Sequence, residues 1–340
     1  NLPHLSYNRG GEKWIKEVAS YMATRHRVTV ITTDYMKFND INDLKFNYIV
    51  LKFKRKMFFL NDISEIKEYL KNTDVVYAMY EWAGTQREIT KHASKVIFGH
   101  HAFIRNFSQK LYYTLIETDK RIKNSYHHFL TEYRASIYRK KSFQKLFVIP
   151  NFVNTEKYSP GYKDTDKFKV VLPGVTSREK GIDIVFRIAE ELGGYDDIEF
   201  YATGRKNNDP KSPTKVRLLG LLPECRYIEI ISNSNLTVLP SRGETFSFSV
   251  LESLAVGNPV VVSNLQDVMS AFGESDAIYY ARMNDVTDFL NGILKYYRLW
   301  KAERDKYIEI SRQARELALK FDSKIVLPRI EEMFEIVYKS

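Results

Sequence analysis

The sequence of 340 residues contains a single cysteine, Cys225. One cysteine excludes an intramolecular disulfide and a cysteine-based zinc cluster, and it fits a reducing compartment. No run approaches about 18 consecutive apolar residues, so we expect no transmembrane helix. The chain also lacks the Gly-Lys-Ser/Thr order of a Walker A loop and the Gly-x-Gly-x-x-Gly fingerprint of dinucleotide sites. A phosphate site in this protein therefore has to be built in another way.

The net charge of +10 is distributed unevenly along the chain. Residues 1–160 carry 27 Lys and Arg against 15 Asp and Glu, a balance of +12, whereas residues 161–340 carry 25 against 27, a balance of −2. All seven histidines also lie in the first part. Such an uneven distribution indicates an N-terminal half that meets an acidic partner or surface.

Two series of short apolar strands, separated by helical segments, run along the chain. The first series has predicted strands at 27–32, 48–53, 74–79 and 95–100, with helices at 12–23, 62–71 and 86–93. The second has strands at 168–173, 197–202, 216–219 and 235–239, with helices at 182–192, 286–299, 302–319 and 323–339. This alternation predicts parallel sheets covered on both faces, divided at the proline-containing segment 149–161. A strand before Asn1 would complete the first unit, so we expect residues upstream of it.

Residues 237–262 form the most informative stretch. They predict a buried strand, a polar turn, a short helix, a Gly-Asn-Pro turn and a second buried strand, with Glu244 and Glu252 around the start of the helix. Such a helix start offers backbone N–H groups and a positive dipole end to a phosphate. Carboxylates beside a phosphate site suit hydroxyl groups, so the combination indicates a nucleotide sugar. The alternative is that both glutamates only stabilise the helix dipole.

A second candidate lies in the loop 174–181, between a predicted strand and a predicted helix. Arg178 and Lys180 could hold a diphosphate there, or the loop could be an ordinary solvated turn. The one Asp-x-Asp triplet, Asp164 to Asp166, lies in the polar linker before a strand. We interpret it as solvated linker rather than a metal site, and we expect no resident metal or cofactor.

The N-terminal half offers two further candidates. Ligands of parallel sheets collect at the carboxyl ends of the strands. The loop with Gly10 and Gly11 and the pair His100 and His101 both lie where this rule places a site. The alternative for either histidine is a packing or surface role.

The chain resembles the retaining GT-B glycosyltransferases of family 4, the glycosyl transferases group 1. The Glu-x7-Glu motif of that family stands here as Glu244 to Glu252, between Pro-Ser-Arg-Gly and Ala-Val-Gly-Asn-Pro-Val-Val. Its N-terminal glycine pair matches Gly10-Gly11-Glu12, and its hinge signature matches residues 149–154. The resemblance implies an α/β GT-B protein whose two Rossmann-like domains have parallel sheets that face each other across a cleft. The domains would be 1–160 on the acceptor side and 161–322 on the donor side, with the helix 323–340 packed back on the first.

The resemblance also implies roles for individual residues. Glu252 would hold the ribose hydroxyls, and Glu244 would lie near the transferred sugar together with His100 or His101. Lys180 matches the lysine that binds the diphosphate in the family. The full set of implied donor-binding residues comprises Gly10, Gly11, Arg178, Lys180, Arg205, Thr245, Phe246, Ser247 and Glu252. We place Arg205 in a loop that could meet the base, and for residues 245–247 we expect contacts through the backbone.

Several positions depart from the pattern of the family. Val175 stands where the family has an arginine, so the diphosphate loses one cation unless Arg178 or a neighbour supplies it. Thr245 replaces the usual glycine, and Phe152 and Asn154 replace Gly and Asp in the hinge signature.

Residues 52–60 interleave cations with large apolar side chains. Such a segment can lie at an anionic bilayer surface, and the basic stretch 134–145 would add to it. The alternative is a basic strand edge and turn. No recognised nucleic-acid-binding motif accompanies the basic charge.

These features predict transfer of a sugar from a nucleotide-diphosphate donor, built on UDP or GDP, to a hydroxyl of a glycan, lipid or protein acceptor with retention of configuration. We expect an enzyme in the cytoplasm, with peripheral contact to the inner face of a membrane left open. Two alternatives remain. One is a nucleotide-sugar epimerase of the same fold, and the other is a non-catalytic basic protein that binds nucleic acid or membrane on a degenerate scaffold. The donor sugar and its base stay open.

Overall fold

The computed structural model describes residues 10–33, 45–51, 66–80, 86–102, 107–161, 163, 166–175, 177–204 and 215–340. Arg205, most of the triplet 164–166 and the basic segment 52–60 lie outside the described residues. The chain divides into two compact units, which we call the N-unit (1–151 with 326–340) and the C-unit (152–325). The predicted division at 160/161 lies nine residues beyond the boundary between the two units at 151/152, at the end of the linker 149–161.

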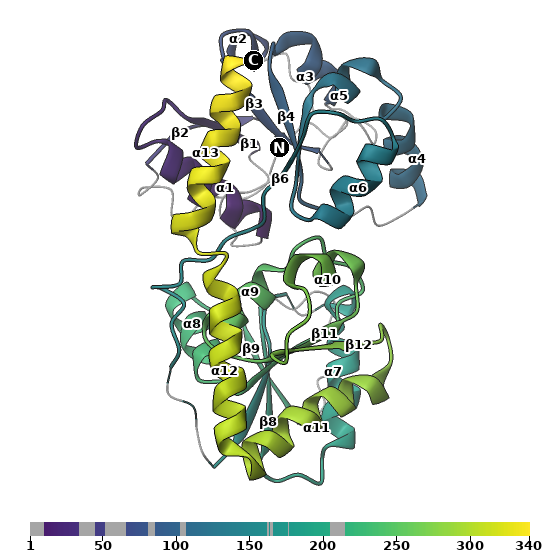
Figure 1. The fold of residues 1–340 in the computed structure, drawn as a ribbon, viewed down its shortest axis with the longest axis vertical. Coiled ribbons are helices and arrows are strands. Elements are labelled where there is room, and N and C mark those ends of the chain that lie inside the picture. The colour runs from purple at the N-terminus through teal and green to yellow at the C-terminus, as the bar shows by residue number, and fades with distance from the viewer. Residues whose placement is uncertain are drawn as a thin grey trace. The chain divides into compact units, whose positions relative to one another are not determined.

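The N-unit contains two groups of parallel strands. β1 (Thr29–Thr33) pairs with β2 (Asn47–Leu51), and a four-stranded sheet has the order β3 (Val76–Met79), β4 (Val96–His100), β5 (Tyr126–Phe129) and β6 (Leu146–Val148). Its helices are α1 (Gly10–Met22), α2 (Lys67–Lys71), α3 (Gln86–His92), α4 (Phe107–Ile116), α5 (Lys120–Asn124) and α6 (Glu132–Lys140), and it also includes α13 (Ser323–Lys339) from residue 326 onward (Figure 1).

Helix α1 shows why the apolar periodicity of the N-unit produces this arrangement. Trp14, Val18 and Met22 recur every four residues and are all buried, so that one face of the helix packs on the unit. The main core cluster combines side chains from the sheet and the helices, including Tyr80, Phe98, Ile116 and Ile122. Burial on this scale fixes β3 and β4, and the candidate histidines lie at the carboxyl end of β4.

The C-unit holds one six-stranded parallel sheet. Its strands are β7 (Phe168–Leu172), β8 (Ile198–Thr203), β9 (Val216–Gly220), β10 (Leu236–Leu239), β11 (Val260–Ser263) and β12 (Ile278–Ala281), in the order β12-β11-β10-β7-β8-β9. Its helices are α7 (Ile182–Glu191), α8 (Glu224–Ser232), α9 (Phe248–Ala255), α10 (Gln266–Phe272), α11 (Val286–Ala302) and α12 (Arg304–Leu319). Helices α7 and α11 cover one face of the sheet, and α8, α9 and α12 cover the other (Figure 1). Every residue of β10 and β11 is buried, as expected for a sheet covered on both faces.

The strand order of the C-unit reverses between β7 and β10. From β7 the chain runs through β8 to β9 at one edge, and from β10 it runs through β11 to β12 at the other edge. β7 and β10 pair directly, with Leu236 opposite Val170. The loops that follow these two strands therefore emerge side by side, at the point where open α/β sheets bind their ligands.

None of the helices in the described part of the chain is long and apolar enough to cross a bilayer. The parallel α/β architecture predicted from the sequence is confirmed, since every strand pairing among the described strands is parallel.

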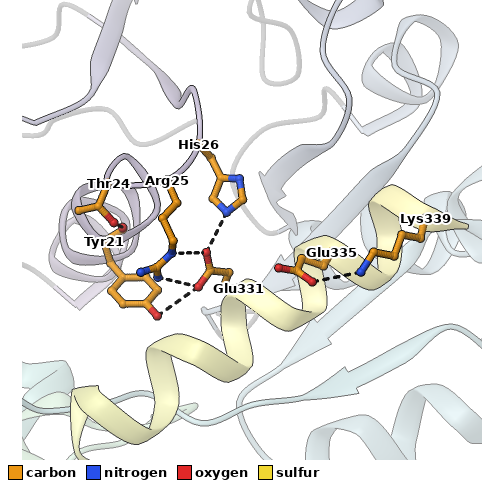
Figure 2. A network of polar contacts seen from close by, with 7 residues as sticks. All are labelled: Tyr21, Thr24, Arg25, His26, Glu331, Glu335 and Lys339. Carbon is orange, nitrogen blue, oxygen red and sulfur yellow. Dashed lines mark hydrogen bonds and ion pairs between the residues drawn. The ribbon is translucent and has the colours of Figure 1, made fainter.

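Helix α13 is held on the end of α1 by one carboxylate. Figure 2 shows Glu331 receiving hydrogen bonds from Arg25 at 2.8 and 2.6 Å and from Tyr21 at 3.2 Å, with the His26 ring at 2.8 Å. The hydrogen bonds from Arg25, and then those from His26 and Tyr21, lower the pKa of Glu331 to about 2. In the same helix, Lys339 Nζ and Glu335 Oε2 form an exposed ion pair at 3.2 Å.

We expect the change Glu331→Gln to lower the free energy of unfolding at pH 7 by about 1–2 kcal/mol. The value is moderate because solvent around the half-exposed Arg25 side chain screens part of its attraction to Glu331. The folded-state pKa of Glu331 is depressed, so its contribution is present above the unfolded pKa near 4.5 and is lost as the pH falls toward 2. Urea unfolding between pH 7 and pH 3 would show the difference between the two proteins shrinking below pH 4.5.

The matched control is Glu335→Gln, which removes an exposed i,i+4 pair and should change stability by less than about 0.5 kcal/mol at every pH. Equal losses in the two variants would contradict the special role of Glu331.

Candidate functional site

The loop after β7 is shaped by two glycines with positive φ. Gly174, at φ 97°, donates its N–H to Thr203 Oγ1 of β8 at 3.0 Å. The short 3-10 turn Arg178–Lys180 follows, with Ser177 as its N-cap, and Gly181 ends it at φ 77°. This geometry places Lys180 directly before α7.

Lys180 contacts the loop after β10. Its Nζ lies 2.5 Å from Glu244 Oε1, and Ser241 donates its hydroxyl to the same oxygen at 3.0 Å. The Glu244 side chain is 13% exposed and that of Lys180 is 32% exposed, so the pair is partly shielded but open to a ligand. Two candidates separated by more than sixty residues in the sequence thus meet at the reversal point of the sheet.

A second contact ties the two loops together. Arg242 donates two hydrogen bonds to the carboxylate of Asp183 in α7, both at 2.9 Å. Its backbone N–H donates to the carbonyl of Glu179 at 2.8 Å, and its guanidinium also donates to the carbonyl of Arg178. A bidentate Arg–carboxylate pair fixes orientation as well as distance, so Arg242 holds the turn that carries Lys180.

Glu244 also lines a small pocket beneath the loop. The pocket is lined by Leu239, Ser241, Glu244, Ser247, Val250, Val262, Ser263, Leu265 and Val268. Within the described residues, the buried hydroxyl of Ser263 has no hydrogen-bond partner. A buried hydroxyl without a partner is costly, so this pocket suits a polar ligand group or a water molecule.

Glu252 is buried within α9, with 5% of the residue exposed. Tyr227 of α8 donates its hydroxyl to Glu252 Oε2 at 2.7 Å. Burial, and then the nearby Glu252 charge, raises the pKa of Tyr227 well above its usual value, so the phenol remains a donor. The contact fixes one oxygen of the Glu252 carboxylate.

The residues between the two glutamates use their side chains for packing and capping. Phe246 packs against Phe272 and Phe321, with ring centroids 5.0 and 5.6 Å away. Ser247 caps α9 by accepting the N–H of Val250 at 3.4 Å. Thr245 is buried as well. Contacts of this segment with a ligand through its backbone stay a prediction from the sequence.

The two candidate histidines of the N-unit have different surroundings. His100 ends β4, is 2% exposed, stacks on Phe129 at 4.2 Å and pairs with His127 at 3.0 Å. His101 is only half-buried and lies 2.6 Å from the Tyr77 hydroxyl. Burial lowers the pKa of both histidines well below the usual range, so both are neutral. His100 therefore occupies the core, and His101 is the accessible member of the pair.

Trp14 connects this histidine with the glycine pair. Its indole lies 4.6 Å from the His101 ring, between centroids, and Trp14 follows Gly10 and Gly11 in the first turns of α1. The start of α1 and the end of β4 thus share one edge of the N-unit.

Comparison with known proteins finds a family match within the C-unit. Residues 167–298 match the family model described as Glycosyl transferases group 1. These residues belong to the glycosyl transferases group 1. The alpha-galactosylglucosyldiacylglycerol synthase of Streptococcus pneumoniae is 31% identical over 149 residues, which cover 36% of this chain and 38% of that protein. The N,N'-diacetylbacillosaminyl-diphospho-undecaprenol alpha-1,3-N-acetylgalactosaminyltransferase of Campylobacter jejuni is 24% identical over 235 residues, which cover 62% of this chain and 60% of that protein.

The chain thus spans less than two thirds of the length of these curated relatives. Among solved structures, Alr3699/HepE of Anabaena, crystallised with UDP and glucose, is similar with a TM-score of 0.76 at 14% identity, over 97% of each chain. The likeness shows that the chain has the GT-B fold, as the sequence predicted.

The glycosyl transferases group 1 segment brings Lys180, Glu244 and Ser241 into direct contact. Glu252 has a separate contact with Tyr227, and Arg178 lies on the same 3-10 turn as Lys180. Gly10, Gly11 and His101 belong to the N-unit. Among the described residues, no group of three His, Cys, Asp or Glu side chains could hold a metal ion.

Three contributors to these sites were not predicted. Arg242 lies in the Pro-Ser-Arg-Gly segment directly before the Glu-x7-Glu motif, two residues before Glu244, and this position was the available signal. Tyr227 and Tyr77 carry no signal in the sequence, because each reaches its partner from a different helix or strand.

Gly181 offers a test of the loop geometry in this segment. An added Cβ would lie 2.2 Å from the Pro240 carbonyl oxygen, at a φ of 77° that side chains disfavour. We expect Gly181→Ala to lower the free energy of unfolding by about 2–4 kcal/mol, measured by urea unfolding.

Gly194 provides the matched control, because an added Cβ there would meet nothing within 4 Å. Gly194→Ala should change stability by less than about 0.5 kcal/mol. A similar loss in both variants would show that the close approach of Gly181 to Pro240 is unimportant.

Proposed function

We propose that the protein transfers a sugar from a nucleoside-diphosphate sugar to an acceptor hydroxyl, with retention of configuration. The observation that carries this proposal is the contact of Lys180 with Glu244 where the sheet order reverses, inside the segment of the glycosyl transferases group 1. A cation paired with a carboxylate matches a ligand that offers both phosphate charge and hydroxyl donors.

The proposed chemistry places the largest change of charge on the diphosphate. The bond from the anomeric carbon to the diphosphate oxygen breaks, and its electron pair leaves with the nucleoside diphosphate. The acceptor hydroxyl oxygen bonds to the same carbon, and its proton passes to the departing diphosphate. Lys180 and the N–H groups at the start of α9 would stabilise this growing negative charge. Glu244 would accept hydrogen bonds from the transferred sugar, and Glu252 would accept them from the ribose.

The known proteins support a UDP-sugar as the first donor to examine. The related Anabaena structure holds UDP and glucose, and both curated relatives are named for alpha-linked products. Transfer from an alpha-linked nucleotide sugar to an alpha-linked product retains the configuration of the anomeric carbon.

A lipid-linked acceptor is the class that the observations favour. The names of the two relatives specify a diacylglycerol and a diphospho-undecaprenol acceptor. In this chain, residues 1–160 carry a balance of +12, and α4 exposes Leu111 and Leu115 beside Lys110. Exposed apolar side chains among cations suit peripheral contact with an anionic membrane.

The test combines binding with turnover. Thermal unfolding of the whole chain would be followed with UDP, GDP and ADP, and sugar transfer would be followed with labelled nucleotide sugars and anionic vesicles that contain glycolipid acceptors. We expect one nucleoside diphosphate to raise the melting temperature and the matching sugar to appear in an alpha-linked product.

Two results would overturn the proposal. Release of an epimerised free sugar without acceptor would indicate the epimerase alternative. The absence of stabilisation by every nucleotide, with retained binding to vesicles or DNA, would indicate a non-catalytic binding protein.

A further inference from the structure

A buried serine lies at the end of β11 in the C-unit. Ser263 is 1% exposed, and within the described residues its hydroxyl has no hydrogen-bond partner. Taking a hydroxyl out of water without giving it a partner is costly, so buried hydroxyls in proteins almost always have one. The partner of Ser263 is therefore expected in the pocket that its side chain lines.

The backbone around Ser263 fixes the position of this side chain. Ser263 pairs with Ala281 of β12, and the N–H of Asn264 donates to the carbonyl of Ala281 at 2.8 Å. The N–H of Leu265 donates to the carbonyl of Ser263 itself at 2.7 Å. Every residue of β11 is buried, so the strand has little room to shift. The hydroxyl can rotate, but it stays at the wall of the pocket.

The pocket beneath the loop that carries Glu244 has both polar and apolar walls. Its polar residues are Ser241, Glu244, Ser247 and Ser263. Its apolar residues are Leu239, Val250, Val262, Leu265 and Val268. The three serines are buried, and the Glu244 side chain is 13% exposed. An apolar occupant would leave these polar groups without partners, so the pocket suits a polar one.

The hydrogen bonds that these side chains already make show what each can still offer. Ser241 donates its proton to Glu244 Oε1 at 3.0 Å, so its oxygen can only accept further hydrogen bonds. Ser247 accepts the N–H of Val250 at 3.4 Å, so its proton remains for donation. In the described part of the chain, Lys180 and Ser241 both contact Glu244 at Oε1, so Oε2 can accept. Two donors, from Ser247 and Ser263, thus face two acceptors.

The size of the pocket selects its occupant. The free space is about 10 Å³, which is just enough for one water molecule. A sugar hydroxyl that is still attached to its ring is too large for this space. A water molecule has two protons to donate and two lone pairs to accept with, and buried waters make two to four hydrogen bonds. The set of two donors and two acceptors matches this requirement.

We propose that one water molecule occupies this pocket and that Ser263 is a positioning residue that holds the water against the Glu244 carboxylate. Lys180 and Ser241 fix one oxygen of Glu244, and the water fixes the other. In the proposed complex Lys180 turns to the diphosphate, and Ser241 and the water remain to hold the carboxylate for the sugar. This effect on the sugar rests on the proposed function, whereas the water follows from contacts within the C-unit.

The first experiment detects the water directly. A crystal structure of the whole chain at a resolution that shows ordered waters is expected to contain one water molecule within hydrogen-bond distance of Ser263 Oγ and the Glu244 carboxylate, with or without UDP. The water should be missing from Ser263→Val, because a methyl group then fills the pocket. A dry pocket in the unaltered protein, or a Ser263 hydroxyl that donates to a backbone carbonyl instead, would overturn the inference whatever the enzyme does.

The second experiment tests the effect of the water on Glu244. Calorimetry with UDP and UDP-glucose, or with GDP and GDP-mannose if only GDP binds, separates the nucleoside diphosphate from the sugar. We expect Ser263→Ala and Ser263→Val to weaken binding of the nucleotide sugar by about 3- to 10-fold and that of the bare nucleoside diphosphate by less than about 2-fold. A general loosening of the loop would weaken both ligands equally, because Lys180 contacts the same loop.

Ser234→Ala is the matched control. It deletes a buried hydroxyl of the C-unit that donates to the carbonyl of Ile230 at 2.7 Å and does not line the pocket. The ratio of the two affinities should stay unchanged in this variant.

The two parts of the inference fail separately. A bound water with an unchanged ratio of affinities in both Ser263 variants would overturn the positioning role while glycosyl transfer stands. No binding of any nucleotide to the unaltered protein would overturn the proposed function, and the crystal structure would still decide whether the water is present. Equal changes of the ratio in Ser263→Ala and Ser234→Ala would show a general effect on packing and would also overturn the positioning role.

Discussion

Glutamine in place of Glu252 is expected to weaken nucleoside diphosphate binding by about 30- to 1000-fold, equivalent to about 2–4 kcal/mol. In the proposed complex the buried carboxylate accepts two ribose hydroxyls, and hydrogen bonds to a charged group contribute about 1.5–3 kcal/mol each. Glutamine keeps the shape but replaces one acceptor with an NH₂ donor, which faces either Tyr227 or the ribose. Isothermal titration calorimetry with UDP and GDP measures the loss.

A dideoxy nucleotide isolates the contribution of the ribose. With 2′,3′-dideoxyuridine diphosphate the hydroxyls are absent, so Glu252→Gln should cost less than about 5-fold in affinity. Tyr227→Phe is the matched control, because it removes the phenol that contacts Glu252 Oε2 and leaves the carboxylate in place. Equal weakening of the ribose and dideoxy ligands by Glu252→Gln would mean that Glu252 shapes α9 and does not bind the nucleotide.

Alanine in place of Lys180 is expected to lower kcat by about 100- to 1000-fold, the range seen when one preorganised group that stabilises developing charge is removed. The negative charge on the diphosphate increases as the sugar leaves, so the loss should be larger in kcat than in the affinity for the intact donor. Steady-state kinetics at saturating donor, together with calorimetry, separates the two quantities.

Removal of Lys180 also leaves Glu244 without its cation, which could disturb the loop. The double variant Lys180→Ala with Glu244→Ala removes this unpaired charge, so thermal stability should recover while kcat stays low. Arg178→Ala is the matched control, because it removes a cation from the same 3-10 turn and leaves the contact of Lys180 with Glu244 in place. A larger loss of kcat from Arg178→Ala than from Lys180→Ala would show that Arg178 supplies the cation that Val175 lacks.

Most strands of the C-unit could be predicted from the sequence because strands such as β7, β10 and β11 are short apolar runs that are largely buried, whereas β12 and the helices α8 and α10 were not predicted. The strands at 168–172, 236–239 and 260–263 agree with the expected ranges to within about one residue. In the N-unit, β5 and β6 and the helices α4 to α6 were not predicted. β5 has the sequence Tyr-His-His-Phe. Two adjacent histidines do not indicate a buried strand in the sequence, because the aromatic side chains and carbonyl groups that pack against them and accept their hydrogen bonds come from other elements.

The candidate site was predictable as a set of residues but not as a set of contacts. The contact of Lys180 with Glu244 depends on the direct pairing of β7 with β10, between which the chain passes through β8 and β9. The bidentate contact of Arg242 with Asp183 depends on the same pairing. His100 and His101 could not be told apart, because neighbouring residues at a strand end point in different directions and only the sheet shows which direction is buried.

The ion pair between Lys180 and Glu244 has a consequence for discrimination among anions. A bare phosphate or sulfate that approaches Lys180 also approaches the Glu244 carboxylate, and the repulsion between like charges offsets much of the attraction. A diphosphate that carries a sugar brings hydroxyl donors for Glu244 together with oxygens for Lys180. In the proposed complex, each of the two side chains would therefore replace its contact with the other by a contact with the ligand. For the proposed donor site, we therefore expect the loop to discriminate against inorganic anions and to bind an anion that carries hydroxyl groups.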